Sequence, residues 1–267
     1  MTIRTVPTLC WSVAANPSAL GVKMHDAGYQ SLGLDYKYVA LGSTDIEPVL
    51  AAVRALGIRG LGVSMPHKQN VIANLDWASA DVHTIGACNT VVNDAGRLSG
   101  HNTDWQGAWR AVVESGIGNV ESAVVIGAGG VARAIAYALA INGARVTIAA
   151  RRLEQAEALV KDLSLSKAVE LDLLTQNPAD FTLVVNATPD PGVVKQDLLQ
   201  QARGVLDVIF QTRETSLTQA ARDRGLAVVP GWRMLLHQGA AQFELYTGVA
   251  APIEAMSQVL EAALPES

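Results

Sequence analysis

Short apolar runs alternate along the chain with longer segments in which apolar residues recur every three or four positions. In the first hundred residues this pattern predicts strands at 8–13, 36–41 and 59–64 and a helix at 17–32. Thr44 and Glu47 have the spacing of a capping box, which predicts a further helix that reaches about Leu56. The segments 89–92 and 97–99 flank a glycine-bearing turn and predict a hairpin.

After Asn102 the alternation becomes regular. It predicts helices at 103–115, 129–142, 153–163, 195–202 and 215–224, and strands at 122–126, 144–149, 182–186, 204–209 and 226–229. Parallel neighbouring strands must be joined by a crossover long enough to hold a helix, and each pair of predicted strands is separated by such a helix. The pattern therefore predicts an α/β protein whose second part is a doubly wound parallel sheet. The last forty residues predict two helices, at 231–247 and 252–263. The change of pattern near residue 102 predicts a domain boundary.

Composition narrows the class of partner. The 267 residues are 49% hydrophobic and 17% charged with a net charge of −5, which suits two domains with a sizeable core. Without a run of Lys and Arg, a nucleic-acid or membrane partner is not expected, and the expected partner is a small molecule. Cys10 and Cys88 are far apart, and neither a signal peptide nor a membrane span is recognisable, so we expect a cytoplasmic protein.

A glycine-rich turn carries the clearest chemical signal. An apolar strand ends at Ile126, helical residues follow from Arg133, and between them lies the run Gly127-Ala128-Gly129-Gly130-Val131-Ala132. In this setting G-x-G-x-x-G/A predicts dinucleotide binding, since the glycines permit a tight turn and a close approach of the pyrophosphate, which the helix N-terminus then binds. A purely structural turn is the alternative.

The end of the next strand indicates which dinucleotide. NAD enzymes usually place a carboxylate there for the ribose 2′-hydroxyl, whereas this chain has Arg151 and Arg152. Two guanidinium groups suit a 2′-phosphate, so the sequence favours NADP over NAD. The alternative is that both arginines belong to the solvated start of a helix.

Hydride transfer to or from an alcohol also requires a group that moves a proton. Lys68 follows a predicted strand in a loop stiffened by Pro66, and it is either this group or an ordinary surface lysine. Asp104 precedes a helix at the domain boundary and is either a cleft residue or a helix N-cap. The five histidines include no His-x-x-x-His pair and no Cys/His cluster, so no metal site is expected.

Several further motifs occur together in this chain. They are Val63-Ser64-Met65-Pro66-His67-Lys68, Gly86-Ala87-Cys88-Asn89-Thr90-Val91, Asn102-Thr103-Asp104, Asn186-Ala187-Thr188 and Met234-Leu235-Leu236-His237-Gln238-Gly239-Ala240-Ala241. With the glycine turn, they resemble the shikimate dehydrogenase family along nearly the entire chain. The resemblance implies reversible, NADP-linked interconversion of 3-dehydroshikimate and shikimate, a step of aromatic amino acid biosynthesis, on two domains and without a metal.

The resemblance also implies domains and residue roles. Residues 1–101 would form the substrate-binding catalytic domain, with the C-terminal helices of 236–267 packed back on it, and 102–235 the NADP-binding Rossmann domain. Lys68 would exchange the hydroxyl proton, with Asp104 as its partner on the same substrate hydroxyls. The other implied substrate-binding residues are Ser18, Ser64, Asn89 and Gln238, and the other implied cofactor-binding residues, besides the glycine turn, are Arg151, Arg152, Thr188, Ile209 and Gly231.

Departures from the family pattern concentrate at the carboxylate end of the substrate site. The usual Ser-x-Ser is not intact and leaves Ser18 as its only hydroxyl, Gly62 stands where an Asn is usual, and Phe210 where a Tyr is usual. Losing such partners costs about 1 kcal/mol or more each in transition-state binding, which predicts slow turnover of shikimate.

The pattern is closer to the divergent shikimate-dehydrogenase-like branch. The alternatives are a dehydrogenase of quinate, an aminoshikimate or a related ring acid, and a regulator that binds NADP(H) without turnover. A monomer or a homodimer is expected.

Overall fold

A computed structural model describes residues 6–176 and 180–265 of the chain. The chain divides into two compact units. The first unit comprises the residues up to Thr103 together with Gly239–Ala263, and the second comprises Asp104–Gln238 with the residues from Leu264 on. The outermost residues of the expected domain ranges, 1–5 and 266–267, lie outside the described residues.

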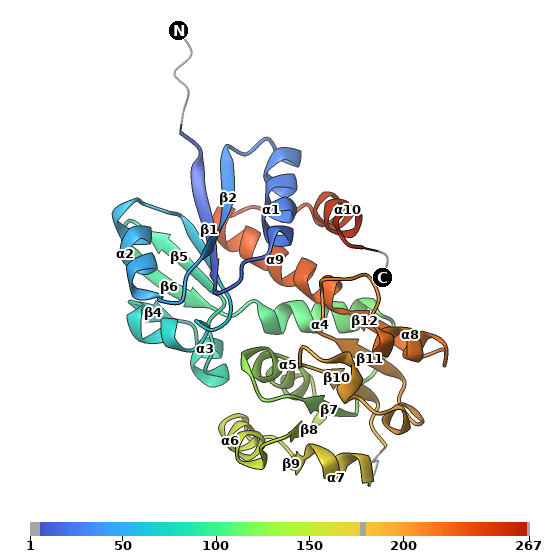
Figure 1. The fold of residues 1–267 in the computed structure, drawn as a ribbon. Coiled ribbons are helices and arrows are strands. Elements are labelled where there is room, and N and C mark those ends of the chain that lie inside the picture. The colour runs from blue at the N-terminus through green and yellow to red at the C-terminus, as the bar shows by residue number, and fades with distance from the viewer. Residues whose placement is uncertain (1–5, 177–179, 266–267) are drawn as a thin grey trace. The chain divides into compact units, whose positions relative to one another are not determined.

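The first unit contains a mixed six-stranded sheet in the order β2-β1-β3-β5-β6-β4 (Figure 1). Its strands are β1 (Thr8–Ala14), β2 (Tyr36–Gly42), β3 (Gly60–Val63), β4 (Trp77–Ala78), β5 (Thr90–Asp94) and β6 (Arg97–His101). The first three run parallel, and β5 runs antiparallel to both β3 and β6. The predicted hairpin is confirmed, and its two-residue turn places Ala95 and Gly96 at positive φ, as a tight hairpin requires.

Helices α1 (Ala19–Ser31), α2 (Glu47–Ala55), α3 (Ala80–Ile85) and α10 (Ile253–Ala263) also belong to the first unit. The apolar stripe that predicted α2 is confirmed, because Leu50 and Val53 are buried in the core beside Ile58 and Leu61 of the next segment. The predicted capping box is wrong. Ile46 is the N-cap and makes no side-chain cap bond.

The second unit contains a parallel six-stranded sheet in the order β12-β11-β10-β7-β8-β9, which confirms the doubly wound prediction. Its strands are β7 (Ser122–Ile126), β8 (Arg145–Ala150), β9 (Lys167–Glu170), β10 (Leu183–Asn186), β11 (Gly204–Asp207) and β12 (Ala227–Pro230). Its helices are α4 (Asp104–Glu114), α5 (Gly130–Ile141), α6 (Leu153–Leu163), α7 (Leu171–Gln176) and α8 (Ser216–Arg222). Helix α9 (Gly231–Thr247) begins in the second unit and ends in the first.

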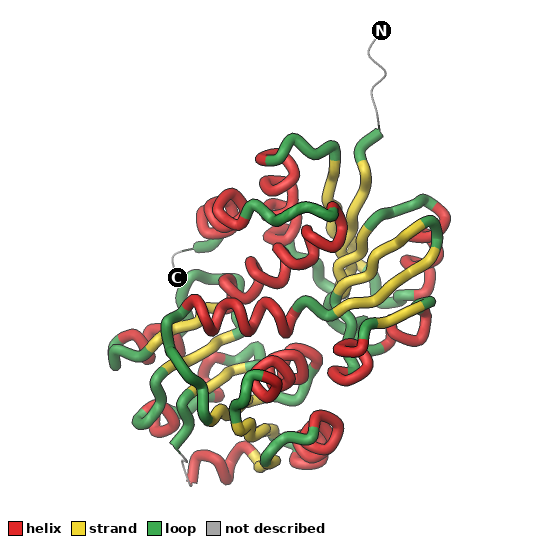
Figure 2. Tube along the Cα trace, turned by 180° about the vertical axis from the view of Figure 1, so that it is seen from behind, coloured by secondary structure: helices red, strands yellow, loops and turns green. Residues whose placement is uncertain are grey.

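Both faces of this parallel sheet are buried. Successive side chains of a strand point to opposite faces, and in β7 Ala123 and Val125 join one apolar cluster while Val124 and Ile126 join another. Figure 2 shows the sheet (yellow) with helices (red) on its two sides. This explains why the central strands β7, β10 and β11 are nearly continuous apolar runs rather than alternating ones.

Two differences from the predicted elements have local causes. The helix predicted at 195–202 is a single 3₁₀ turn, Gln196–Leu199, whose adjacent Leu198 and Leu199 are both buried, so one turn suffices to cover the sheet. Strand β9 escaped prediction because it is an edge strand with a charged residue at each end and only two half-buried positions between them. No described helix has the length and apolar character needed to cross a membrane.

A buried aromatic cluster in the first unit contains a titratable side chain. His25 is 1% exposed, its ring stacks on Tyr38 with the centroids 4.1 Å apart, and its Nδ1 lies 2.9 Å from the Gly21 carbonyl oxygen. Burial lowers the pKa of His25 from 6.5 to about 4, against smaller opposing effects of the Gly21 carbonyl and Asp26. The folded protein therefore keeps this imidazole neutral in mild acid.

Stability is expected to decrease in mild acid because of His25. Between the two pKa values the unfolded chain binds a proton that the folded chain excludes, so the free energy of unfolding falls by about 2 kcal/mol from about pH 7 to about pH 5. Urea unfolding at the two pH values measures this change. His25→Phe should lose it while His83→Gln, at an exposed histidine, should retain it. An equal pH dependence in wild type and His25→Phe would contradict the assignment.

Candidate active site

The loop that carries Lys68 is held on both sides by backbone hydrogen bonds. It leaves β3 at Ser64, whose carbonyl accepts a bond from the His67 N–H at 2.8 Å. The His67 ring is buried, with Nε2 2.8 Å from the Ser43 carbonyl oxygen. The Lys68 carbonyl accepts a bond from the Cys88 N–H at 2.7 Å, and the Lys68 side chain is half-buried. The backbone at Lys68 is therefore held in place, unlike the backbone of a free surface loop.

Asn89 is the centre of a buried polar network in the same unit. Its Oδ1 accepts bonds from the Thr103 N–H at 2.7 Å and the Thr90 hydroxyl at 2.9 Å, and its Nδ2 lies 2.9 Å from the Thr103 Oγ1. Gln242 Nε2 donates to the Asn89 carbonyl at 3.1 Å and to the Thr90 hydroxyl at 3.0 Å. The sequence had singled out Asn89 but not Gln242, whose place in an apolar helix gave no distinguishing signal.

This network brings three of the sequence motifs together. Cys88 binds the backbone of Lys68, the adjacent Asn89 binds Thr103, and Asp104 follows Thr103 directly. Asp104 is 4% exposed and is the first residue of α4. Ser18 has a different position: it is exposed, and it is the N-cap of α1, accepting a bond from the Leu20 N–H at 3.2 Å.

Gln238 lies against α4 at a point where only glycine fits. A Cβ added to Gly107 would lie 2.7 Å from both the Cβ and the backbone nitrogen of Gln238, and 2.8 Å from the Met234 carbonyl oxygen. The backbones of α4 and α9 therefore approach closely here. Because residues three apart share a helix face, Asp104 lies one turn before this contact on the same side of α4.

Gly107→Ala is expected to separate α4 and α9, because backbone atoms cannot yield to the added methyl group. The expected cost is about 1–3 kcal/mol of stability, because the methyl group displaces Gln238 and the α9 backbone. Gly21→Ala is the matched control, since a Cβ at this helical glycine meets nothing within 4 Å. It should be neutral or stabilising. Urea unfolding compares the stability of the two variants, and equal effects would contradict a close approach of the two helices at Gly107.

A cluster of charges holds the beginning of α9 on the end of α4. Arg233 donates to both carboxylate oxygens of Glu114, and the His237 Nε2 lies 3.1 Å from Glu114 Oε2. Partial burial acts to raise the pKa of the Glu114 carboxyl, but the bonds and charges of Arg233 and His237 together outweigh it and lower the pKa. The cluster fixes the helix position of His237, and with it that of the adjacent Gln238.

The glycine turn has the geometry that a dinucleotide requires. Gly127 has a φ of +120°, and a Cβ there would lie 3.0 Å from the Ala187 carbonyl oxygen. Gly129 is the N-cap of α5, makes no side-chain cap, and would direct a Cβ into open space. The first N–H groups of α5 are thus uncapped by a side chain and approachable by a phosphate, whereas Ala132 is fully buried against the sheet. These residues fit the pyrophosphate of a dinucleotide.

The remaining candidate cofactor residues lie on loops that leave the same sheet. Arg151 and Arg152 follow β8 directly, and both are exposed, so the residues present suit a 2′-phosphate. Thr188 follows β10, Ile209 follows β11, and Gly231 follows β12. The strands are parallel, so all four loops leave from the same edge of the sheet, where ligands of such folds bind.

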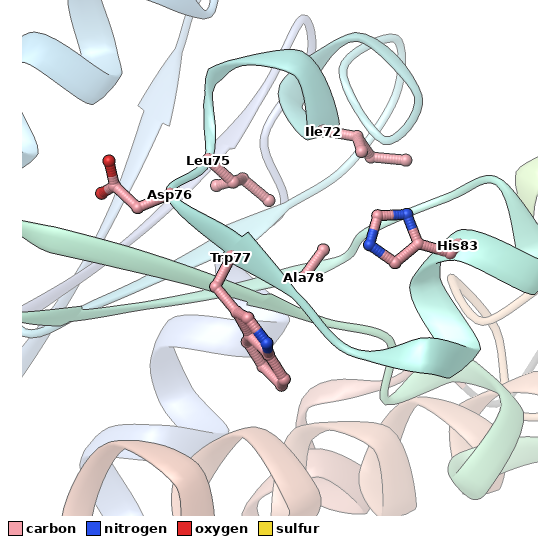
Figure 3. Close-up of a pocket in the computed structure, with 6 residues that line it drawn as sticks. All are labelled: Ile72, Leu75, Asp76, Trp77, Ala78 and His83. Atoms are coloured by element: carbon pink, nitrogen blue, oxygen red, sulfur yellow. The ribbon is translucent and has the colours of Figure 1, made fainter.

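A separate cavity of about 350 Å³ lies in the first unit, beside β4 (Figure 3). It is lined by Ile72, Leu75, Asp76, Trp77, Ala78 and His83. None of the residues proposed from the sequence lines it. Within the described residues, no three His, Cys, Asp or Glu side chains gather in a way that could hold a metal ion.

Comparison with known families matches three models to successive parts of the chain. They are described as the shikimate dehydrogenase substrate binding domain, over residues 17–91, shikimate / quinate 5-dehydrogenase, over 113–204, and the shikimate 5'-dehydrogenase C-terminal domain, over 231–261. A curated relative, shikimate dehydrogenase (NADP(+)) of Natronomonas pharaonis, is 38% identical over 90% of this chain and 93% of its own. The protein of the same name from Dehalococcoides mccartyi strain 195 is 34% identical over 99% of each chain.

Solved structures show the same likeness. The Thermus thermophilus shikimate 5-dehydrogenase in complex with NADP(H) and shikimate has a TM-score of 0.87 and 33% identity, over 96% of this chain and 100% of its own. Quinate dehydrogenase from Corynebacterium glutamicum in complex with NAD has a TM-score of 0.85 and 30% identity, over 96% and 99% of the two chains. The similarity therefore extends through both units.

Proposed function

The chain belongs to the shikimate dehydrogenase family, and we propose on this premise that it is an NADP-dependent oxidoreductase that interconverts shikimate and 3-dehydroshikimate. The observation that carries the proposal is the buried network around Asn89. It fixes the backbone of Lys68 on one side and the residue before Asp104 on the other. A binding protein without turnover has no need of a fixed proton-transfer pair.

Lys68 serves as the proton-transfer group. In the oxidation direction NADP⁺, when bound, would supply the acceptor for the hydride of the substrate alcohol. The hydroxyl proton passes to the Nζ of Lys68, and in the reduction direction Lys68 returns it to the carbonyl oxygen. Asp104 accepts hydrogen bonds from the substrate hydroxyls and keeps the Lys68 ammonium near them. Asp104 is 4% exposed at the start of α4 and directly follows Thr103 of the Asn89 network, which supports a fixed position for this carboxylate.

Further residues orient the substrate. Ser64, Asn89 and Gln238 supply polar groups for the ring hydroxyls, and Ser18 supplies the hydroxyl left at the carboxylate end. The bonds of Asn89 to Thr103 support a role in holding the substrate side rigid. The close contact of Gln238 with α4 supports its orientation relative to Asp104, which begins that helix.

The second unit binds the cofactor. The N–H groups of α5 and the run Gly127-Ala128-Gly129-Gly130-Val131-Ala132 hold the pyrophosphate, and Arg151 and Arg152 hold the 2′-phosphate. Thr188 and Ile209, in the loops after β10 and β11, bind other parts of the cofactor, and Gly231, after β12, lies near the nicotinamide. The uncapped helix N-terminus and the two exposed arginines support NADP as the cofactor.

The substrate is tested by a steady-state comparison of shikimate, quinate and an aminoshikimate with NADP⁺. We expect the highest kcat/KM for shikimate, with a low kcat because the Ser-x-Ser of the carboxylate site is missing. A preference for quinate or an aminoshikimate would move the assignment to another ring acid. Binding of NADPH without turnover of any of the three compounds would change the assigned function from an enzyme to a regulator.

The proposal also covers the compartment and the oligomeric state. The enzyme acts in the cytoplasm, which is supported by its two buried, free cysteines, Cys10 and Cys88, since free thiols persist in a reducing compartment. It acts as a monomer or a homodimer on a small-molecule substrate, and sedimentation of the purified chain distinguishes the two states.

A further inference from the structure

Asp207 is a fully buried carboxylate that the proposed chemistry does not use. It is the last residue of β11 and is 1% exposed. Three donors from three different segments converge on it. Asn186 Nδ2 donates to Oδ1 at 3.0 Å, the Ile209 N–H donates to Oδ1 at 3.3 Å, and the Thr215 hydroxyl donates to Oδ2 at 2.6 Å.

Each donor belongs to a segment that leaves the binding edge of the sheet. Asn186 ends β10 and lies directly opposite Asp207 in the parallel pairing. Ile209 lies in the loop after β11, and Thr215 is the N-cap of α8, with a capping box to Thr218. One carboxylate therefore connects the end of β10, the loop after β11 and the beginning of α8.

Asn186 extends this connection into the next loop. Its Oδ1 accepts bonds from the Thr188 N–H at 3.0 Å and the Thr188 hydroxyl at 2.8 Å, and its Nδ2 also donates to the Asp190 carbonyl at 3.1 Å. Asp207 contributes to the orientation of the Asn186 amide, since its carboxylate accepts only from the NH₂ end. The conformation of the Thr188 loop thus depends on a group on the neighbouring strand.

Two glycines, Gly127 and Gly231, pack closely against the loops of Thr188 and Ile209. A Cβ at Gly127 would lie 3.0 Å from the Ala187 carbonyl oxygen and 3.3 Å from the Thr188 Cγ2. A Cβ at Gly231 would lie 2.5 Å from the Ile209 carbonyl oxygen and 2.7 Å from that of Asp207. Loops in such tight contact with backbone atoms shift together, so a displacement of Thr188 or Ile209 reaches the glycine turn and the start of α9.

We propose that Asp207 is a positioning residue for the dinucleotide: its carboxylate fixes the loops of Thr188 and Ile209 in the arrangement that receives the cofactor. The inference rests on the proposed function, because it takes these loops as the cofactor loops. A carboxylate is suited to this position because it accepts from all three donors at once, whereas an alanine would remove the acceptor that the three segments share. Burial raises the pKa of Asp207, and the three donors act in the opposite direction.

Calorimetric titration with NADP⁺ tests the proposal without requiring turnover. Asp207→Ala is expected to raise the Kd for NADP⁺ about tenfold or more, because three loop contacts are lost together. Asp207→Asn keeps an acceptor at Oδ1 and can donate to the Thr215 hydroxyl, so it should raise Kd only about threefold. The KM for shikimate, whose proposed contacts lie elsewhere, should stay within about twofold of wild type in Asp207→Asn.

Thr215→Ala is the matched control. It removes the Oδ2 donor and the α8 capping box but leaves the bonds to Asn186 and Ile209, so it should lower the melting temperature while leaving the Kd for NADP⁺ within about twofold of wild type. A Thr215→Ala protein that loses NADP⁺ affinity as strongly as Asp207→Ala would overturn the proposal in favour of general destabilisation. If Asp207→Ala does not fold, a Kd for Asp207→Asn equal to that of wild type overturns it as well. Failure of the wild-type chain itself to bind NADP⁺ would instead refute the proposed function.

Discussion

Lys68→Ala is expected to reduce kcat for shikimate oxidation by about 10²–10⁴-fold, the usual contribution of a positioned proton-transfer group. The fold should be retained, because the Lys68 contact that fixes this loop is made by its backbone carbonyl, which alanine keeps. The Kd for NADP⁺ should not change, since the cofactor residues belong to the second unit. Initial rates of NADPH formation, circular dichroism and calorimetry measure the three quantities.

A second lysine provides the control for Lys68. Lys23 is exposed on α1, and Lys23→Ala should retain the wild-type kcat. If Lys68→Ala also kept more than about a tenth of the wild-type kcat, general acid–base work by Lys68 would be too small for the proposed role. The proton would then have to be exchanged by another group, and the assignment of this lysine would fail.

Gly60→Ala is expected to destabilise the first unit by about 3 kcal/mol, because the sheet has no room for a methyl group at this position. An added Cβ would overlap the Tyr246 ring, which is 1% exposed and packed in the core. The ring has nowhere to move, since it lies among the aromatic residues around His25. Urea unfolding followed by tryptophan fluorescence measures the loss.

A glycine on another strand of the same sheet is the control. At Gly42, the last residue of β2, an added Cβ would make only an ordinary contact of 3.8 Å with Pro17. Gly42→Ala should therefore change the free energy of unfolding by less than about 1 kcal/mol. A loss at Gly60→Ala no larger than at Gly42→Ala would show that the packing of Tyr246 on β3 is looser than described.

Much of the fold could be predicted because long periodic segments determine their own structure. The doubly wound sheet followed from strands and helices in strict alternation, and α9 was predicted with its observed bounds, Gly231–Thr247. Short or polar elements were missed, as β9 shows. The two residues of β4 could not be predicted either, because so short an edge strand forms only by pairing with β6.

The candidate site could be predicted in part. Lys68, Asp104 and the glycine turn stood out because their residue types and surroundings point to a chemistry. Asp207 and Gln242 did not, since each sits in an otherwise apolar element and acquires its role only through partners distant in sequence, such as Thr215 for Asp207 and Asn89 for Gln242. Gly107 belongs to the same class, because the sequence does not show that α9 lies against it.

The decisive measurement is to mix the purified wild-type chain with shikimate and either NADP⁺ or NAD⁺ and to follow the absorbance of the reduced nicotinamide. We expect a steady increase with NADP⁺ and a kcat/KM for NADP⁺ at least about tenfold above that for NAD⁺, because Arg151 and Arg152 favour the 2′-phosphate. No increase with either cofactor, in a sample shown to bind NADP⁺, would contradict the proposed function.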